Sequence, residues 1–86
     1  MNEGIEKSGT FAIVAGIIRD ITGNPGLKIE PAHTAVDIRN WDSLRHVMII
    51  NEIENHFAIQ FDLTEMLDIS SVGDICIAIT RKQSNA

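Results

Sequence analysis

Cysteine, basic residues and long apolar runs are all scarce in this sequence of 86 residues, and each shortage excludes a class of protein. With one cysteine, Cys76, the chain cannot form an intramolecular disulfide, so its stability must come from packing. We expect Cys76 to be a small buried hydrophobe rather than a reactive thiol. No apolar run approaches the roughly 18 residues of a membrane span, and the N-terminus lacks the pattern of a secretory signal. We therefore expect a cytoplasmic protein with no membrane span.

Basic side chains are outnumbered by acidic ones. Seven Lys and Arg stand against twelve Asp and Glu, which gives a formal net charge of −5. The imbalance is concentrated between Asp42 and Asp74, where seven acids accompany a single base, Arg45. A nucleic-acid binder needs clustered Lys and Arg to contact phosphates, so the charge argues against this class. The acidic half instead favours basic protein partners.

The length allows one hydrophobic core. We predict a single domain over residues 8–82, a flexible N-terminal segment at residues 1–7 and a flexible C-terminal tail at residues 83–86. Apolar residues with a three-then-four spacing predict a first amphipathic helix from about Ser8 to Thr22, which the Gly and Pro residues at 23–26 end. The residues that follow this spacing are Phe11, Val14, Ile18 and Ile21.

A long loop follows, to about Trp41. A loop of this length needs its own apolar contacts with the core, or a function, to be accommodated in a small domain. The side chains that we expect to pin it are Leu27, Ile29, Val36 and Ile38.

A second helix is predicted from Asp42 to about Phe57, a stretch without Gly or Pro in which Asp42 is a good N-cap. Residues placed 100° apart divide between a core stripe and an exposed face. The expected core stripe is His46, Ile49, Ile50, Ile53 and Phe57. The expected opposite face is Leu44, Met48, Asn51, Glu52 and Asn55.

Two further helix starts appear near the C-terminus. Asp62 with Glu65 forms a capping-box pattern that predicts a short helix through Leu67, and Ser71 with Asp74 predicts the start of a last helix. The β-branched run 75–80 could alternatively be a strand, but the sequence offers no partner strand, so we interpret it as helix. The fold class is therefore all-α, with three main helices, one short helix and a long loop between the first and second helices.

Conventional catalytic constellations are absent from the sequence. The three histidines, His33, His46 and His56, show neither helical i,i+4 pairing nor neighbouring ligands, so we expect them to be solvated or packed and predict no metal site. Glu52 and Glu54 are two residues apart on a helix and do not face each other, which argues against acid-base catalysis by that pair.

What remains is Asp42-Ser43-Leu44, a hydroxyl after an acid at the start of an amphipathic helix. In an arbitrary protein such a Ser is most often only a cap. Here, however, the segment 52–57, the segment 59–61 and the order of the helices all accompany it. With these features the sequence resembles the acyl carrier protein family over nearly its whole length, and the predicted bundle is acyl-carrier-like.

The resemblance implies that Ser43 receives 4′-phosphopantetheine from coenzyme A and that the distal thiol then carries acyl groups as thioesters. No base accompanies Ser43 in the sequence, so a separate phosphopantetheinyl transferase must catalyse the attachment, and we predict that the chain is not an enzyme. Independently of any family, a phosphodiester on Ser43 would lie at the positive end of the second helix.

The residues around Ser43 are expected to meet the partner enzymes, which would include acyl-activating, acyltransferase or synthase enzymes. The residues that we assign to partner recognition are Asp42, Leu44, Arg45, Val47, Met48 and Asn51. Trp41 and Arg45 depart from the pattern of fatty-acid carriers, which favours a dedicated carrier in a lipid, polyketide or surface-polymer pathway. A carrier of aminoacyl or peptidyl groups, or an unmodified helical adaptor, is the alternative. Nothing in the sequence demands more than a monomer.

Overall fold

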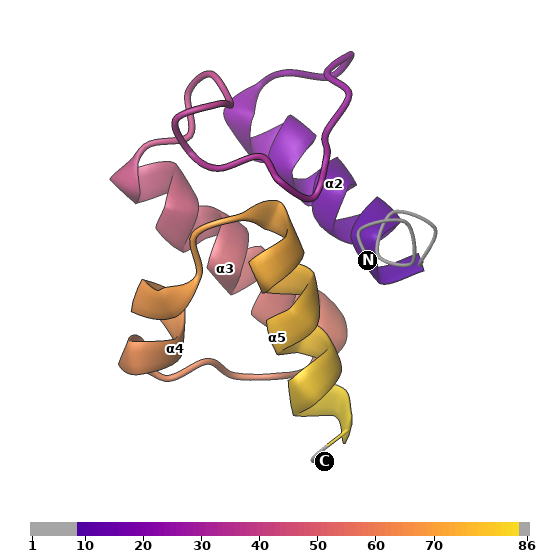
Figure 1. Cartoon of the computed structure of the whole chain (residues 1–86), viewed down its shortest axis with the longest axis vertical. Helices are drawn as coiled ribbons and strands as arrows, with labels where there is room; N and C mark the ends of the chain where they lie inside the picture. Colours follow the sequence, from indigo (N-terminus) through magenta and orange to yellow (C-terminus); the bar gives the residue numbers. More distant parts are fainter. Residues whose placement is uncertain (1–8, 85–86) are drawn as a thin grey trace.

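The computed structural model describes residues 9–84, and helices dominate this part of the chain. Three helices are long and one is short, in the order α2 (Gly9–Thr22), α3 (Ser43–Phe57), α4 (Leu63–Asp68) and α5 (Val72–Ser84) (Figure 1). Within residues 9–84 the β-type pairing consists of an isolated bridge between Thr34 and Ser71. The all-α prediction is confirmed, and the run 75–80 lies within α5.

The chain ends differ slightly from expectation. Helix α5 continues to Ser84, so Gln83 and Ser84, which we assigned to a flexible tail, are helical. The expected flexible segment at residues 1–7 and the last two residues of the tail lie outside the described residues. Within residues 9–84, no helix is long and apolar enough to cross a membrane.

The core forms where α2 packs against both α3 and α5. Helix α3 contributes Ile49, Ile50 and Ile53, all fully buried, as the predicted helical phase requires. Cys76 of α5 is buried as expected, and burial raises the pKa of its thiol to about 11. His46 and Phe57, at the two ends of the predicted stripe, are only half-buried.

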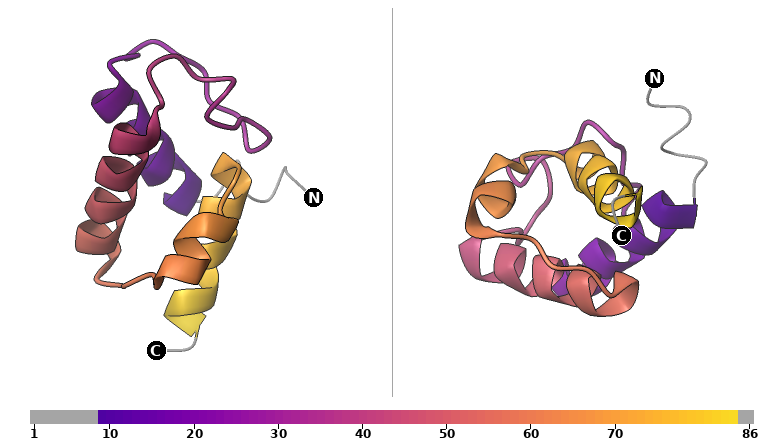
Figure 2. Two further views of the ribbon diagram at one scale, coloured as in Figure 1. Left: turned by 90° about the vertical axis from the view of Figure 1, so that its left-hand side faces the viewer. Right: turned by 90° about the horizontal axis from the view of Figure 1, so that it is seen from below.

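The long loop between α2 and α3 crosses one end of the bundle, where α3 and α5 both begin (Figure 2). Ile29 and Ile38 pin it to the core as predicted, and Leu27 packs against the core from a half-buried position. The prediction for Val36 was wrong, because its side chain is 94% exposed. Hydrophobicity alone could not show that Val36 faces away from the core.

Hydrogen bonds hold this loop at two places. At the α2 end, Gly23 adopts φ +72°, and the Asn40 side-chain amide donates to the Thr22 carbonyl at 3.1 Å. In the middle of the loop, the Pro31 carbonyl accepts the N–H of Gly73, in the first turn of α5, at 2.8 Å. The loop therefore satisfies N–H groups that the first turn of α5 could not pair within the helix. This attachment sets where the loop stands relative to the start of α3.

The segment between α3 and α5 is less deeply packed. Ala58 ends α3 in the left-handed region, and the Phe61 N–H donates to the Glu54 carboxylate at 2.8 Å. Asp62 and Glu65 form the predicted capping box at the start of α4. Helix α4 has no fully buried residue, and it lies between α3 and α5 mainly through half-buried side chains.

Candidate functional site at the start of α3

Ser43 is the first residue of α3, and its side chain is exposed. Asp42 caps the helix, as predicted, because its carboxylate accepts the Arg45 backbone N–H at 2.8 Å. The N–H of His46 donates to the Asp42 carbonyl at 2.8 Å. The first N–H groups of a helix lack intrahelical partners, so those of Ser43 and Leu44 remain for an anion at this end. A phosphodiester on Ser43 fits this arrangement.

Arg45, the single base between Asp42 and Asp74, is paired with a neighbouring acid. Its Nη1 lies 2.8 Å from Asp42 Oδ2, one turn back along the helix. The pKa of Asp42 lies below its ordinary value, mainly because its carboxylate accepts the Arg45 backbone N–H. Desolvation raises this pKa in part, and the positive charge of Arg45 lowers it further. The two charges therefore balance each other beside Ser43, and the surface there is nearly neutral.

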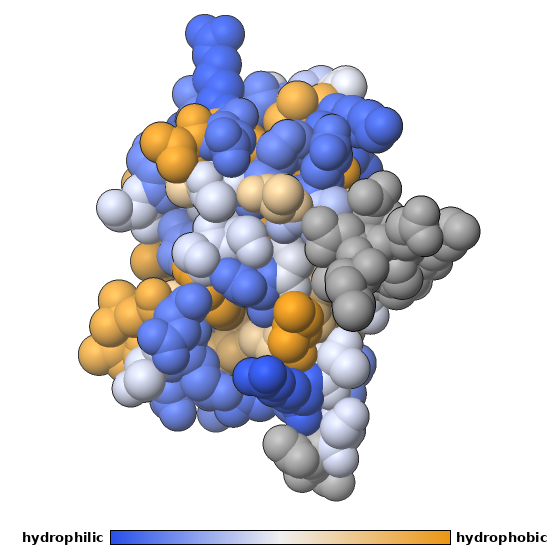
Figure 3. All heavy atoms as spheres, in the orientation of Figure 1, coloured by the Kyte–Doolittle hydropathy of each residue, from blue (hydrophilic) through white to orange (hydrophobic). Residues whose placement is uncertain are grey.

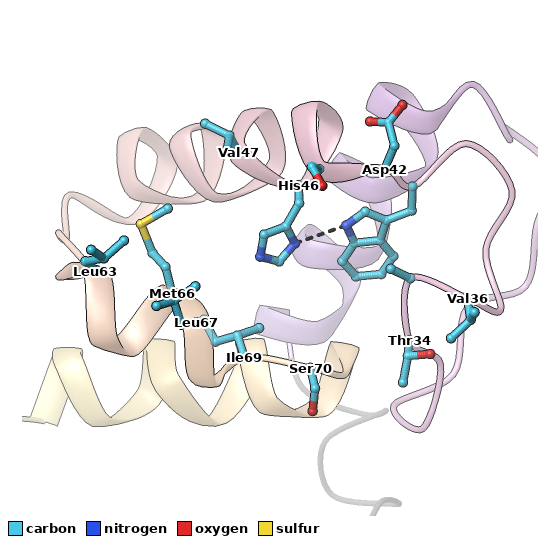
Figure 4. A pocket seen from close by; sticks show the side chains of 13 residues that line it. Thr34, Val36, Asp42, His46, Val47, Leu63, Met66, Leu67, Ile69 and Ser70 are labelled. Atoms are coloured by element: carbon cyan, nitrogen blue, oxygen red, sulfur yellow. Dashed lines mark hydrogen bonds between the residues drawn. The ribbon is translucent and has the colours of Figure 1, made fainter.

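A pocket opens beside Ser43 that the sequence analysis did not predict. Its volume is about 810 Å³, and its walls come from the start of α3, from α4 and from the long loop. Most of its lining is apolar. Val36 stands at the loop side, and Leu63 and Leu67 of α4 are exposed at the opposite side (Figure 4). Exposed valine and leucine side chains on two separate elements are thus brought to one cavity.

Trp41 and His46 form the inner wall of this pocket. Trp41 is 6% exposed, and its indole Nε1–H donates to His46 Nδ1 at 3.1 Å. The two rings are stacked, with centroids 5.9 Å apart and an interplanar angle of 23°. Burial lowers the pKa of His46, and the Met66 carbonyl partly offsets this effect.

The predicted site residues divide between this pocket and the outer face of α3. Asp42, Ser43 and Val47 line the pocket, whereas Leu44, Met48 and Asn51 do not, and all three of these are exposed. Leu44 is 69% exposed, so its predicted position away from the core is confirmed. Figure 3 shows hydrophobic residues gathered at the lower left of the molecule, over α4, where Leu63 and Leu67 lie.

The arrangement around Ser43 does not provide a nucleophile with its base. Within residues 9–84, no side chain is hydrogen-bonded to the Ser43 hydroxyl, and the Nδ1 of His46, one turn away, already accepts the Trp41 indole N–H. No cluster of His, Cys, Asp and Glu in the described residues could hold a metal ion. The geometry is that of an accessible hydroxyl at a helix start, next to an apolar pocket.

Comparisons with known proteins agree with this geometry. A family model described as "Phosphopantetheine attachment site" matches residues 12–79. The chain is also similar to the solution NMR structure of a holo acyl carrier protein from Geobacter metallireducens, with 28% sequence identity and a TM-score of 0.81. That match covers 91% of this chain and 90% of the other. No curated protein matches the chain.

The fold and the site define a small helical carrier protein. The family match spans most of the chain, which therefore belongs to the phosphopantetheine attachment family, that of the acyl carrier proteins. Its prosthetic group is a covalently bound 4′-phosphopantetheine, and its role is that of a carrier, not a catalyst. The fold class expected from the sequence, an acyl-carrier-like bundle, is confirmed.

Proposed function

We propose that Ser43 is the attachment point of 4′-phosphopantetheine and that the arm carries acyl intermediates as thioesters to partner enzymes. The observation that carries this proposal is the exposed hydroxyl at the first residue of α3, which lines the apolar pocket. When bound, the group supplies a thiol on a long arm. The chain itself supplies an exposed oxygen, a helix start that favours an anion, and a neutral surrounding surface.

Attachment needs an enzyme that this chain does not contain. The Ser43 Oγ–P bond forms as the pyrophosphate bond of coenzyme A breaks, and adenosine 3′,5′-bisphosphate leaves. The hydroxyl proton must pass to a base. His46 is not that base, because its Nδ1 accepts the Trp41 indole N–H and its Nε2 then carries the hydrogen of the neutral ring. A phosphopantetheinyl transferase therefore has to dock over the start of α3. Asp42 and Leu44 flank the hydroxyl and are exposed to such a partner.

Intact mass spectrometry tests the attachment point. After incubation with coenzyme A and a broad-specificity phosphopantetheinyl transferase, we expect one phosphopantetheine on the wild type and none on Ser43→Ala. Ser70→Ala is a matched control, because Ser70 lines the same pocket from the opposite side and should leave loading unchanged. Loading of Ser43→Ala at the wild-type rate would remove Ser43 from the proposal.

The exposed face of α3 supports a specialised pathway. Leu44, Val47 and Met48 are all exposed, and the single base of the acidic half is paired with Asp42. A partner of this face must offer apolar contacts, and a Met adapts its shape to such a surface. We therefore propose a lipid, polyketide or surface-polymer pathway whose enzymes select this face, with Asn51 at its edge. A cytoplasmic location and a monomeric state remain predictions.

An Arg45→Asp, Met48→Glu double variant tests whether this face selects partners. The change removes the cation that balances Asp42 and restores an acidic helix, so loading by a fatty-acid synthase acyltransferase should improve while transfer by the cognate enzyme falls. Arg81→Asp is the matched control, because Arg81 is exposed near the end of α5 and lies far along the chain from Ser43. Equal rates for wild type and double variant with both enzymes would show that partners ignore this face.

The cargo distinguishes the acyl proposal from its alternatives. Mass spectrometry of the holo protein isolated from its host should show an acyl thioester released by hydroxylamine. An aminoacyl or peptidyl adduct would assign the chain to a nonribosomal-type pathway instead. A protein that is never modified in the host would point to the adaptor function.

A further inference from the structure

Trp41 separates the pocket beside Ser43 from the hydrophobic core. Among the described residues that line the pocket, it is the one whose side chain is buried, at 6% exposure. The three isoleucines that anchor α3 in the core do not line the pocket. The pocket is therefore a hollow in the surface, and the indole of Trp41 forms the boundary between that hollow and the core.

Two hydrogen bonds and a ring contact hold the indole at this boundary. The Trp41 backbone N–H donates to the Ile38 carbonyl at 3.3 Å, and the indole Nε1–H donates to His46 Nδ1 at 3.1 Å, the dashed line in Figure 4. The His46 ring also stacks against the indole. If the indole swung aside, its N–H would lose this acceptor, and a buried donor without an acceptor is costly. The boundary therefore resists opening.

The outer side of the pocket is open to solvent. Val36, Leu63 and Leu67 all line the pocket, yet the side chains of all three are exposed. Figure 4 shows them on either side of His46, with Val36 on the loop and the two leucines on α4. An acyl chain that lies between these walls gains apolar contacts along its flanks and keeps one side in water.

The core, by contrast, offers nothing to a polar substituent. Among the described residues Thr22 is the one buried polar residue, and its hydroxyl already donates to the Ile18 carbonyl at 2.6 Å. A hydroxyl or keto group pushed into this core would lack a hydrogen-bond partner, which is strongly destabilising. In the open pocket the same group would stay hydrated. The boundary at Trp41 therefore decides which acyl groups the protein tolerates.

We propose that Trp41, held by His46, is a specificity-determining residue: it keeps the cargo out of the core, so that this carrier accepts acyl groups with polar substituents, such as hydroxyl or keto groups, in the open pocket. The inference rests on the proposed attachment at Ser43, which lines the same pocket. An unsubstituted chain gains no more here than a substituted chain of the same length, because neither enters the core.

A chain tethered at Ser43 tests the inference without any phosphopantetheine. Ser43→Cys is joined through a disulfide to a dodecyl chain, or to the same chain with a hydroxyl near its middle. Cys76 does not compete for the reagent, because burial raises the pKa of its thiol to about 11. With Trp41 intact, both chains should raise the Tm by equal amounts. The indole N–H NMR signal of the single tryptophan should show that its hydrogen bond to His46 persists.

Trp41→Leu, made in the Ser43→Cys protein, removes the boundary. The plain chain can then enter the core and the hydroxylated chain cannot, so the plain chain should raise the Tm by about 5–20 °C more. Phe57→Leu is the matched control, because Phe57 packs against the core and lies outside the pocket. In that variant the two chains should still give equal shifts.

A larger Tm shift from the plain chain while Trp41 is intact would overturn the proposal, and this result needs no variant of Trp41 to fold. An indole signal that reports loss of the His46 contact, or no Tm shift from either chain, would also overturn it. Equal shifts in folded Trp41→Leu would show that Trp41 is not the boundary. The series is repeated with acyl-phosphopantetheine loaded by a transferase. If that loading fails while the tethered chains behave as expected, only the proposed attachment at Ser43 is lost.

Discussion

Ile53→Ala is the most direct test of the core that supports the start of α3. Ile53 is fully buried where α3 packs against α2. The substitution removes three carbons at about 0.8 kcal/mol each, or about 2.4 kcal/mol of transfer free energy. The cavity left behind adds to this, so we expect a loss of about 2–5 kcal/mol. For 86 residues the total free energy of unfolding is about 4–13 kcal/mol, so the loss is a large fraction of it.

The loss is measured by urea and thermal unfolding followed by circular dichroism. A decrease of 2.4 kcal/mol corresponds to a fall in Tm of about 10–20 °C for a domain of this size. Glu52→Ala, at the neighbouring exposed position, is the control and should leave the Tm nearly unchanged. If Glu52→Ala lowered the Tm as much as Ile53→Ala, the helical phase that places Ser43, Leu44 and Met48 outside the core would be refuted.

Three further predictions concern backbone and charge. Gly16→Ala should raise the free energy of unfolding by about 0.5–1 kcal/mol, since a Cβ there meets no atom within 4 Å and Ala is the better helix former. Gly73→Ala should instead lower the Tm, since its Cβ would lie 3.2 Å from the Pro31 carbonyl oxygen, which the Gly73 N–H holds in place. The pKa of His46 is lower in the folded state than in the unfolded state, so the unfolded chain binds more protons as the pH falls below 6.5. The contribution of the neutral ring to the free energy of unfolding is therefore fully present above pH 6.5 and declines below it. Urea titrations at pH 7.5 and 5.5 should show this decline in the wild type but not in His46→Gln.

The features that could be predicted from the sequence depend on neighbours along the chain. The N-cap Asp42 bonds to a residue three positions on, and the capping box of Asp62 and Glu65 has the same spacing. The buried face of α3 follows from helical periodicity, which needs no knowledge of the partner helix. The position of Ser43 at an exposed helix start could be predicted for the same reason.

The features that were missed depend on how distant segments meet. Val36 was expected in the core and instead lines the pocket with Leu67, because the loop turns its side chain outward toward α4. The pocket itself requires the loop, α3 and α4 to converge, and no periodicity encodes that. The pairing of Arg45 with Asp42 was a local i,i+3 contact that the sequence did contain.

The distribution of buried residues explains how one small domain can be both stable and adaptable at its site. Fully buried residues come chiefly from α2, α3 and α5, with a few from the loop and from Phe61, so the core does not depend on α4. Ser43 belongs to the rigid part, because its helix is anchored by three buried isoleucines. The walls that face it across the pocket, α4 and the exposed part of the loop, contribute little to that core. These walls can therefore shift around an arm or a cargo while the helix that carries Ser43 keeps its position for a docking enzyme.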